Sequence, residues 1–326
     1  MTQLRGATAM KSRAFCITLL STIAISIATS LPAQAQRARV FVSVTGNDAN
    51  PCTAGSPCKT FQAAHDAVLA GGEISVLDTG GYGTLVINKA VSIVAVGVEA
   101  SIAIPSGVNG ITINAGSSDK VSLRGLTLDG TGVGNHGIVF ESGFSLTVEN
   151  CVVRNMVDNG LLYLSTVTSL QTLAVSNSYF DGNGVDGILI KLSNTGAITA
   201  AIDRTGMNGN TGDGLQIQAV SGSNGNLTVA MTDSVAANNG FAGVLLDNTG
   251  ALGVINTSLT HSLVSGNGVG LEGEGTGAAL WLAQSTLTGN ATGFNFFTNS
   301  VTNTFGDNYF ADNGKSTGLF ITVGKQ

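Results

Sequence analysis

Two stretches of sequence decide the fold: residues 181–190 read DGNGVDGILI, and residues 208–217 read NGNTGDGLQI. Each places a glycine directly before an apolar run, and this arrangement occurs ten times. The glycines are Gly83, Gly110, Gly137, Gly160, Gly187, Gly214, Gly243, Gly270, Gly293 and Gly318. They are separated by 27, 27, 23, 27, 27, 29, 27, 23 and 25 residues. A period of about 20 to 30 residues with small insertions is typical of a solenoid, in which each repeat packs on its neighbours.

Within each repeat, the residues after the glycine alternate between apolar and other types, as in Ile188 and Ile190. This period of two indicates a strand with one buried face. A second strand follows, as in LTVENCVV at 146–153, and then a turn rich in Gly and Asn. Helical crossovers are nearly absent, so the strands are expected to stack in parallel as about ten coils of an all-β parallel β-helix. An up-and-down barrel would not explain a period near 27.

The first 35 residues have the features of a signal peptide. Arg5, Lys11 and Arg13 form a basic start, residues 14–31 are mostly apolar, and Ala33-Gln34-Ala35 is a small-residue cleavage site. A retained membrane anchor would need a longer clean apolar run, and no later segment qualifies as a membrane span. We therefore expect a secreted chain that starts near Gln36 and resides outside the cell, at its surface or in the periplasm.

Residues 36–71 are expected to form a disulfide loop and a capping helix, followed by the β-helix over 72–326. Cys52 and Cys58 flank a short loop, and in an oxidising compartment such a pair forms a disulfide worth about 2 kcal/mol. The alternative, a metal site, lacks further ligands nearby. A helix is predicted over 60–70, with Thr60 as N-cap and Gly71-Gly72 as its stop. It would cover the open end of the solenoid.

The chain is acidic, with 14 Lys and Arg against 20 Asp and Glu and a formal charge of -6. Removal of the signal peptide takes three cations and no acids, which leaves -9. Nucleic acids and anionic membranes bind clustered Lys and Arg, so neither is an expected partner.

The stretch TFQAAHDAVLAGGEISVLDTGGYG at 60–83 resembles the cap helix and first coil of the pectate lyase-like superfamily. The recurrent DG-I/L-x-I and N-x-x-G turns resemble its right-handed parallel β-helix repeats. The resemblance covers about residues 40 to 326 and implies right-handed coils. The superfamily mixes polysaccharide lyases, glycoside hydrolases, phage tailspikes and surface proteins. The hydrolase motifs of its polygalacturonases are missing here, apart from a partial match at Asn135-His136-Gly137.

Candidate site residues come from the second and fourth positions after each glycine, which alternation places on the outside of one sheet. Asp247 and Glu274 would be neighbours about 5 Å apart, with Glu272 two residues along the same strand as Glu274. Close carboxylates repel unless a cation or shared proton relieves them, so the three could bind Ca²⁺ or act as acid and base. Lys191, two coils from Asp247, completes the candidate catalytic set. The simpler alternative is that these are solvated charges on an exposed face.

Further candidates surround this group. Glu141, Lys191, Gln216 and Gln218 are predicted to contact a substrate. Asp186 and Asp213 stack in a column before the glycines and are additional metal candidates, although Asp-Gly is also ordinary turn chemistry. The outward apolar positions predict that a loop or partner chain covers this face. These positions are Val139, Leu162, Leu164, Leu189, Leu245 and Phe320.

Three functions are compatible with these observations. The first is a secreted β-helix protein with a binding or structural role outside the cell or at its surface, recognising polysaccharide without a cofactor. The second is a carbohydrate-active enzyme, such as a lyase that uses Ca²⁺. The third is an oligomeric, tailspike-like adhesin. The missing hydrolase motifs and the scarcity of basic residues favour the first.

Overall fold

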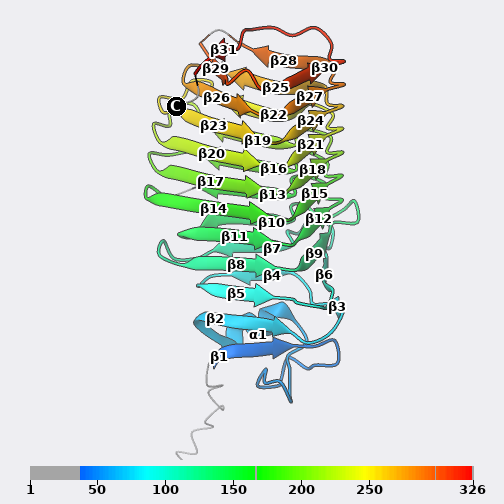
Figure 1. Ribbon diagram of the computed structural model, residues 1–326. Coiled ribbons are helices and arrows are strands. Elements are labelled where there is room, and N and C mark those ends of the chain that lie inside the picture. The colour runs from blue at the N-terminus through cyan, green and yellow to red at the C-terminus, as the bar shows by residue number, and fades with distance from the viewer. Residues whose placement is uncertain (1–36, 166, 298, 325–326) are drawn as a thin grey trace, which may run out of the picture. The chain divides into compact units, whose positions relative to one another are not determined.

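The computed structural model describes residues 37–165, 167–297 and 299–324, which belong to one compact unit. The predicted signal peptide lies outside the described residues. Over the described chain the fold is a parallel β-helix of about ten coils, in which strands of three sheets stack along one axis (Figure 1). Paired strands of the three sheets are parallel throughout, as the sequence predicts.

Each complete coil contributes one strand to each sheet, and incomplete coils at the two ends add further strands to the larger sheets. The twelve-stranded sheet contains, in spatial order, β1 (Arg37–Val42), β2 (Val68–Val76), β5 (Val91–Val94), β8 (Lys120–Arg124), β11 (Ser145–Glu149), β14 (Leu170–Ser176), β17 (Ala197–Asp203), β20 (Asn226–Thr232), β23 (Ile255–Thr260), β26 (Ala278–Ala283), β29 (Val301–Thr304) and β31 (Ile321–Thr322). The ten-stranded sheet contains β3 (Gly80–Gly81), β6 (Ala100–Ala103), β9 (Leu126–Asp129), β12 (Val152–Arg154), β15 (Tyr179–Asp181), β18 (Gly206–Asn208), β21 (Val235–Ala237), β24 (Leu263–Ser265), β27 (Thr286–Thr288) and β30 (Tyr309–Ala311).

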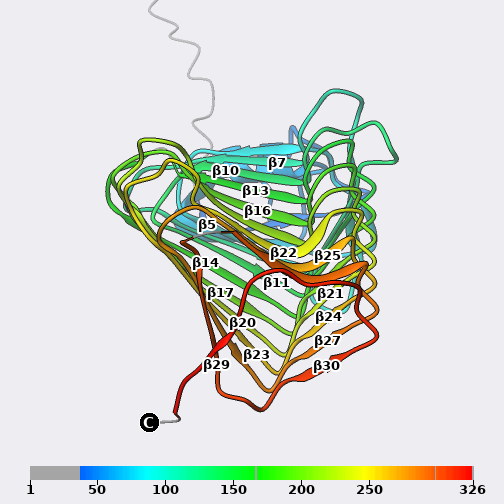
Figure 2. The same cartoon turned by 90° about the horizontal axis from the view of Figure 1, so that it is seen from above.

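The nine-stranded sheet is built from the strands that follow the first nine repeated glycines. The strand after Gly318 pairs with β29 in the twelve-stranded sheet instead, so the prediction that Phe320 lies on the outer face of the nine-stranded sheet is wrong. It contains β4 (Leu85–Ile87), β7 (Ile111–Asn114), β10 (Ile138–Ser142), β13 (Leu161–Ser165), β16 (Ile188–Leu192), β19 (Leu215–Ala219), β22 (Ala242–Asp247), β25 (Val269–Glu274) and β28 (Thr292–Phe296). Viewed along the axis, its strands cross one side of the coil, and loops connect them to the other two sheets (Figure 2).

Coils have three strands rather than the two that the alternation predicts. The segment LTVENCVV is divided into β11 and β12 by Asn150, whose φ is 53°. The same left-handed corner recurs one coil later at Asn177, with φ 48°, and then at Arg204, with φ 45°. Asn tolerates this conformation better than most residues, so the chain turns sharply while the apolar pattern on both sides continues.

The repeated glycines are required because successive coils approach each other closely at these positions. A Cβ atom on Gly187 would lie 2.7 Å from the carbonyl oxygen of Gly214, and one on Gly214 would lie 2.7 Å from that of Gly243. From Gly110 to Gly270, the repeated glycines therefore mark a line along the solenoid where any side chain would clash with the backbone of the next coil.

The interior is apolar, but one corner holds a ladder of buried asparagines. Asn239 donates through its side chain to Asn267 Oδ1 at 2.9 Å and to the Met207 carbonyl at 3.0 Å. Its backbone N–H also donates to Asn267 Oδ1. The ladder continues in the same way through Asn183, Asn210, Asn239, Asn267, Asn290 and Asn313. These side chains satisfy backbone groups at the turn between the ten-stranded and nine-stranded sheets.

The N-terminal end carries the predicted helix, α1 (Phe61–Ala67), which is shorter than expected. Thr60 is its N-cap and accepts a hydrogen bond from the Ala63 N–H at 3.2 Å, as predicted. The predicted stop at Gly71-Gly72 is wrong, because the chain is already extended at Val68 and enters β2. Gly71, with φ 78°, lies where the pairing between β1 and β2 shifts register. Because β1 pairs with β2, the twelve-stranded sheet begins at Arg37 and not at residue 72.

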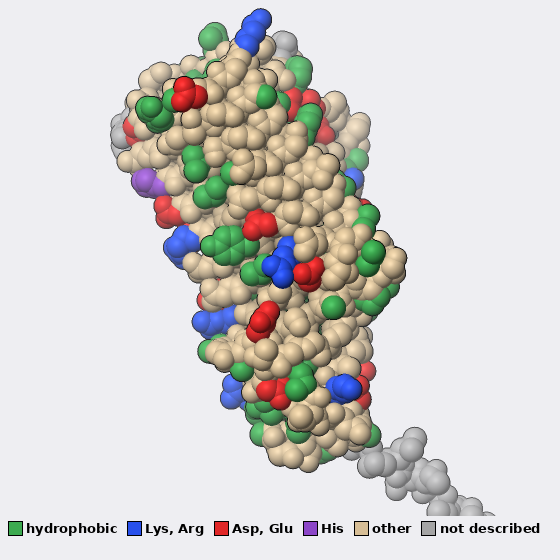
Figure 3. Space-filling view, turned by 90° about the vertical axis from the view of Figure 1, so that its right-hand side faces the viewer, with side chains coloured by type: hydrophobic (Ala, Val, Ile, Leu, Met, Phe, Trp, Pro, Cys, Tyr) green, Lys and Arg blue, Asp and Glu red, His purple; other side chains and the backbone are tan. Residues whose placement is uncertain are grey.

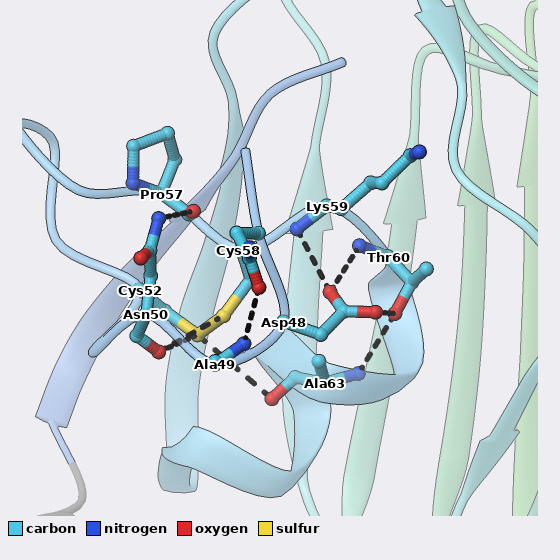
Figure 4. Close-up of a disulfide and its surroundings, with 10 residues drawn as sticks. Asp48, Ala49, Asn50, Cys52, Pro57, Cys58, Lys59, Thr60 and Ala63 are labelled. Atoms are coloured by element: carbon cyan, nitrogen blue, oxygen red, sulfur yellow. Dashed lines mark hydrogen bonds between the residues drawn. A yellow bond between two sulfur atoms is a disulfide. The ribbon is translucent and has the colours of Figure 1, made fainter. Parts of the chain in front are cut away.

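Cys52 and Cys58 form the predicted disulfide beside this helix (Figure 4). Asp48 ties the disulfide loop to the helix start, accepting hydrogen bonds from the N–H groups of Lys59 at 2.8 Å and Thr60 at 2.9 Å. Its other carboxylate oxygen accepts from the Thr60 hydroxyl. Cys151 is a buried free thiol, and burial raises its pKa to about 11.

Candidate functional site

Four polar side chains form a straight column on the outer face of the nine-stranded sheet. Strand register places Lys191 beside Gln218, Gln218 beside Asp247, and Asp247 beside Glu274. They come from β16, β19, β22 and β25, so each step is one strand spacing of about 4.8 Å. The predicted pairing of Asp247 with Glu274 is confirmed, as is the position of Lys191 two coils from Asp247.

Hydrogen bonds fix the middle of this column. Gln218 Nε2 donates to Asp247 Oδ2 at 2.9 Å, and the Thr249 N–H donates to Asp247 Oδ1 at 3.0 Å. Partial burial, with the Asp247 charge beside it, raises the pKa of Glu274. The column thus presents amide, carboxylate and ammonium groups whose positions are set by the strands.

Glu272 lies in the parallel column two residues away and is almost fully buried, with 4% of its surface exposed. Its Oε1 accepts a hydrogen bond from Asn295 Nδ2 at 2.9 Å, while Oε2 has no hydrogen-bond partner among the described residues. Burial, with the Glu274 charge nearby, raises its pKa. A carboxyl in this setting is suited to hold a proton.

The other substrate-binding candidates are spread along the same face. Gln216 lies between Leu189 and Leu245, one column from Gln218. Glu141 lies on β10 at a position where the pairing with β7 shifts register. Strand β13 separates β10 from β16, so Glu141 and Lys191 are two coils apart.

Asp186 and Asp213 point along the axis instead of outward. Asp186 Oδ1 accepts the Asp213 N–H at 2.8 Å, and Asp213 Oδ1 accepts the Ala242 N–H at 2.7 Å. Asn159 has the same role in the preceding coil, accepting the Asp186 N–H. Burial raises the pKa of Asp186 to about 6 and that of Asp213 to about 7. One oxygen of each carboxylate therefore accepts a backbone hydrogen bond from the next coil and links the two coils.

Within the described residues, no group of three or more His, Cys, Asp or Glu side chains is arranged to hold a metal ion. Asp247 and Glu274 are adjacent, but Glu272 makes its hydrogen bond to Asn295 on the far side. Calcium binding by these carboxylates, or by Asp186 and Asp213, therefore stays a prediction.

The apolar positions of this face are covered partly by the chain itself. Val139 and Leu245 are buried, at 4% and 6% exposure, while Leu162 and Leu189 are half-buried. Towards the N-terminal end, the face leads to a cavity of about 320 Å³. Its lining includes Val86 and Thr112 of the sheet together with the loop 107–109. Loops coloured cyan to green rise beside this edge of the sheet in Figure 2.

Comparison with known families settles the fold family. The family described as the right-handed β-helix region matches residues 109–291, which is more than half of the chain. The chain belongs to this right-handed β-helix family. Because this family is right-handed, the match confirms the right-handed coils that the resemblance to the pectate lyase-like superfamily implies.

Solved structures of this β-helix type are similar to the chain at low identity. Pectate lyase Pel9A superposes with a TM-score of 0.56 at 15% identity, over 87% of this chain and 79% of that one. A mannuronan C-5 epimerase A-module from Azotobacter vinelandii gives a TM-score of 0.48 at 16% identity, over 81% and 94%. A rhamnogalacturonan lyase gives 0.47 at 14% identity, over 84% and 72%. No curated protein matches the sequence.

The β-helix also exposes a face formed by the ten-stranded sheet, which carries scattered charges of both signs among uncharged atoms (Figure 3). Arg154 Nε and Asp129 Oδ2 pair there at 3.0 Å, between adjacent strands β12 and β9. Among the residues with described structure, no helix is long and apolar enough to span a membrane.

The asparagine ladder and the position of Asn295 are not predicted from the sequence. Each Asn of the ladder has the pattern of ordinary turn chemistry, and only the repetition of Asn before the glycines signals stacking. Asn295 donates a hydrogen bond to Glu272. It follows Gly293 by two residues, as Glu272 follows Gly270, so the two lie in the same outward column. This shared position is the sequence signal for Asn295.

Proposed function

We propose that this protein binds a neutral polysaccharide outside the cytoplasm, along the outer face of its nine-stranded sheet. The observation that carries the proposal is the column Lys191, Gln218, Asp247 and Glu274, which is in register over four consecutive strands. Polar side chains at steps of about 4.8 Å along the axis can donate to and accept from the hydroxyl groups of an extended sugar chain laid along it. A fold shared with a pectate lyase is compatible with a carbohydrate-related role.

The charge on this face favours a neutral ligand. Asp247, Glu272 and Glu274 lie within two adjacent strands, with Lys191 as the cation of the column. Without a bridging cation, a uronate polymer would bring its carboxylates against these acids and be repelled. Hydroxyl groups of a neutral sugar can instead donate to the carboxylates and accept from the Gln218 amide.

Export from the cytoplasm is supported by two features. The Cys52–Cys58 disulfide is a bond that persists in oxidising compartments. The start of the chain has the pattern of a signal peptide.

A second candidate function, an enzyme acting on carbohydrate, rests on Glu272. Its Oε2, which has no hydrogen-bond partner within the described part of the chain, its burial and its raised pKa are properties of a general acid. It lies beside Glu274, which would serve as the ionised partner. Ca²⁺ would be needed for a lyase reaction that depends on these carboxylates.

The test is a panel of neutral and acidic polysaccharides, with and without Ca²⁺, in affinity electrophoresis of residues 36–326. Retardation by a neutral polymer without Ca²⁺, reduced in Asp247→Ala, is expected. Thr228→Ala, on the outer face of the twelve-stranded sheet, is the matched control. Unsaturated or reducing-end products that vanish in Glu272→Gln would replace the binding role by the enzymatic one. A stable trimer in sedimentation, with no polymer bound, would favour the adhesin.

A further inference from the structure

A separate cavity of about 660 Å³ lies on the outer face of the twelve-stranded sheet, near the C-terminal end of the stack. Trp281 of β26 and Phe305, just after β29, form its aromatic side. Gln284, Asp307, Val323 and Gly324 complete most of the lining. This face is distinct from the one that carries the polar column, so the proposed function leaves the cavity unexplained.

Trp281 rises from a surface of small side chains. It continues a column of Thr, Ala and Ser side chains that pair across successive strands of the sheet. Its own partner on the following strand is Asn303. The column consists of Thr147, Ala174, Ala201, Ala230 and Ser258. The indole is 40% exposed. The ring is therefore partly open to a ligand, on a face otherwise formed by small side chains.

The indole is held in place by a second ring. The centroids of Trp281 and Phe305 are 6.5 Å apart, and the ring planes differ by 29°. Contacts of this kind stabilise aromatic pairs and limit the rotation of each ring. The cavity therefore has a pre-oriented apolar wall.

Polar groups stand at the rim of this wall. Asp307 Oδ1 accepts the Gln284 N–H at 3.2 Å, which anchors the carboxylate next to the cavity. Gln284 itself is exposed and has φ 47°, so its side chain projects from a sharp corner of the coil. An amide and a carboxylate beside an aromatic plane can bind hydroxyl groups while the ring covers an apolar surface.

We propose that this cavity is a second carbohydrate-binding site, which holds one or two units of a neutral saccharide against Trp281. A pyranose has an apolar face of C–H groups, which stacks on an indole, and hydroxyls at its edge, which reach the exposed amide of Gln284. A purely apolar ligand would desolvate this amide without compensation. An anionic sugar would be repelled by the Asp307 carboxylate beside it. The volume lies within the range of small-ligand sites, about 300 to 1,000 Å³.

The chain contains a single Trp, so its indole fluorescence reports on this cavity alone. Residues 36–326 would be titrated with the neutral tetrasaccharides of cellulose, xylan, mannan and starch, and with trigalacturonate as the acidic control. A saturable emission change with at least one neutral sugar, and none with trigalacturonate, is expected. Asp247→Ala should respond like the wild type, which separates this site from the polar column.

Calorimetry with the same sugar, carried out in an Asp247→Ala background so that the polar column contributes little, then tests the residues that line the cavity. Trp281→Ala should weaken binding about ten-fold, and Trp281→Phe, which keeps an aromatic plane, should stay within a few-fold of the wild type. Ser258→Ala, one strand away and outside the lining, should have no effect. No saturable response to any neutral sugar, or equal affinity in Trp281→Ala, would overturn the inference. An emission change that depends on protein concentration and not on sugar would also overturn the inference, because a second copy of the chain would then occupy the cavity.

Discussion

Gln218 Nε2 donates a 2.9 Å hydrogen bond to Asp247 Oδ2 across the gap between β19 and β22. The two residues are 29 positions apart in sequence and directly opposed in register. The bond orients the Asp247 carboxylate within the column that continues to Lys191 on one side and Glu274 on the other. Side chains of different coils are thus combined into one surface by the stacking itself.

The repeated glycines from Gly110 to Gly270 should be intolerant of any side chain. Gly187→Ala would place a Cβ 2.7 Å from the Gly214 carbonyl oxygen, so adjacent coils must move apart. We expect a loss of about 2 to 4 kcal/mol in unfolding free energy. Gly55→Ala is the control, because a Cβ there meets nothing within 4 Å. Equal melting temperatures of the two variants would contradict this explanation of the glycine period.

The asparagine ladder should contribute stability beyond the apolar core. Asn239→Ala removes two side-chain donor contacts and leaves the Met207 carbonyl without its partner. The expected cost is about 2 to 3 kcal/mol. Asn256→Ala, at an exposed position of β23, should change stability by less than about 0.5 kcal/mol. Thermal unfolding followed by circular dichroism measures both, and a harmless Asn239→Ala would show that the ladder is dispensable.

Buried Asp213 should make stability fall as pH rises. Its pKa is about 7 in the folded chain against a usual 3.8, so between these values the folded chain retains a proton that the unfolded chain has lost. The stabilisation is complete below pH 4 and is lost as pH rises towards 7. Asp213→Asn keeps an oxygen for the Ala242 N–H, as Asn159 does for Asp186, and cannot ionise.

Asp213→Asn should therefore exceed the wild type in stability at pH 8, by on the order of 2 kcal/mol. The two proteins should converge at pH 4. Denaturant unfolding at both pH values gives the comparison. Equal stability of the two proteins at pH 8 would mean that ionisation of Asp213 costs the folded chain nothing. A stability difference as large at pH 4 as at pH 8 would mean the same.

The disulfide should stabilise the N-terminal end. Replacing both Cys52 and Cys58 by Ser opens a loop of sequence separation 6, and about 2 kcal/mol is expected to be lost. Hydrogen exchange should accelerate in α1 and β1 and stay unchanged in β19 and β22, since the coils pack mainly on their neighbours. Uniformly faster exchange along the chain would show that the coils unfold as one unit.

Much of the fold could be predicted from local patterns. The period of glycine and alternating apolar residues is enough for parallel coils, because close approach and one-sided burial are needed in every repeat. The left-handed corner at Asn150 was missed, because the apolar alternation of LTVENCVV continues across the corner and reads as one strand. The early end of α1 at Ala67 depends on the pairing of β2 with β1, which lies 31 residues upstream counting from Val68 to Arg37.

The candidate site was predictable in register but not in its polar contacts. Alternation alone placed Asp247 beside Glu274. The same alternation could not show that Asp186 and Asp213 hold backbone N–H groups of the next coil, because this depends on side-chain direction at a turn. Burial of Glu272 and its hydrogen bond to Asn295 depend on the packing of a neighbouring coil.

The most direct test of the proposed function is calorimetric titration of residues 36–326 with the neutral polysaccharide selected in the electrophoresis panel, without Ca²⁺. We expect binding that weakens at least ten-fold in the Gln218→Ala/Asp247→Ala double variant, because the donor and acceptor pair at the centre of the column is removed. Thr228→Ala should retain wild-type affinity. Equal affinity of the double variant and the wild type would contradict binding along the nine-stranded sheet.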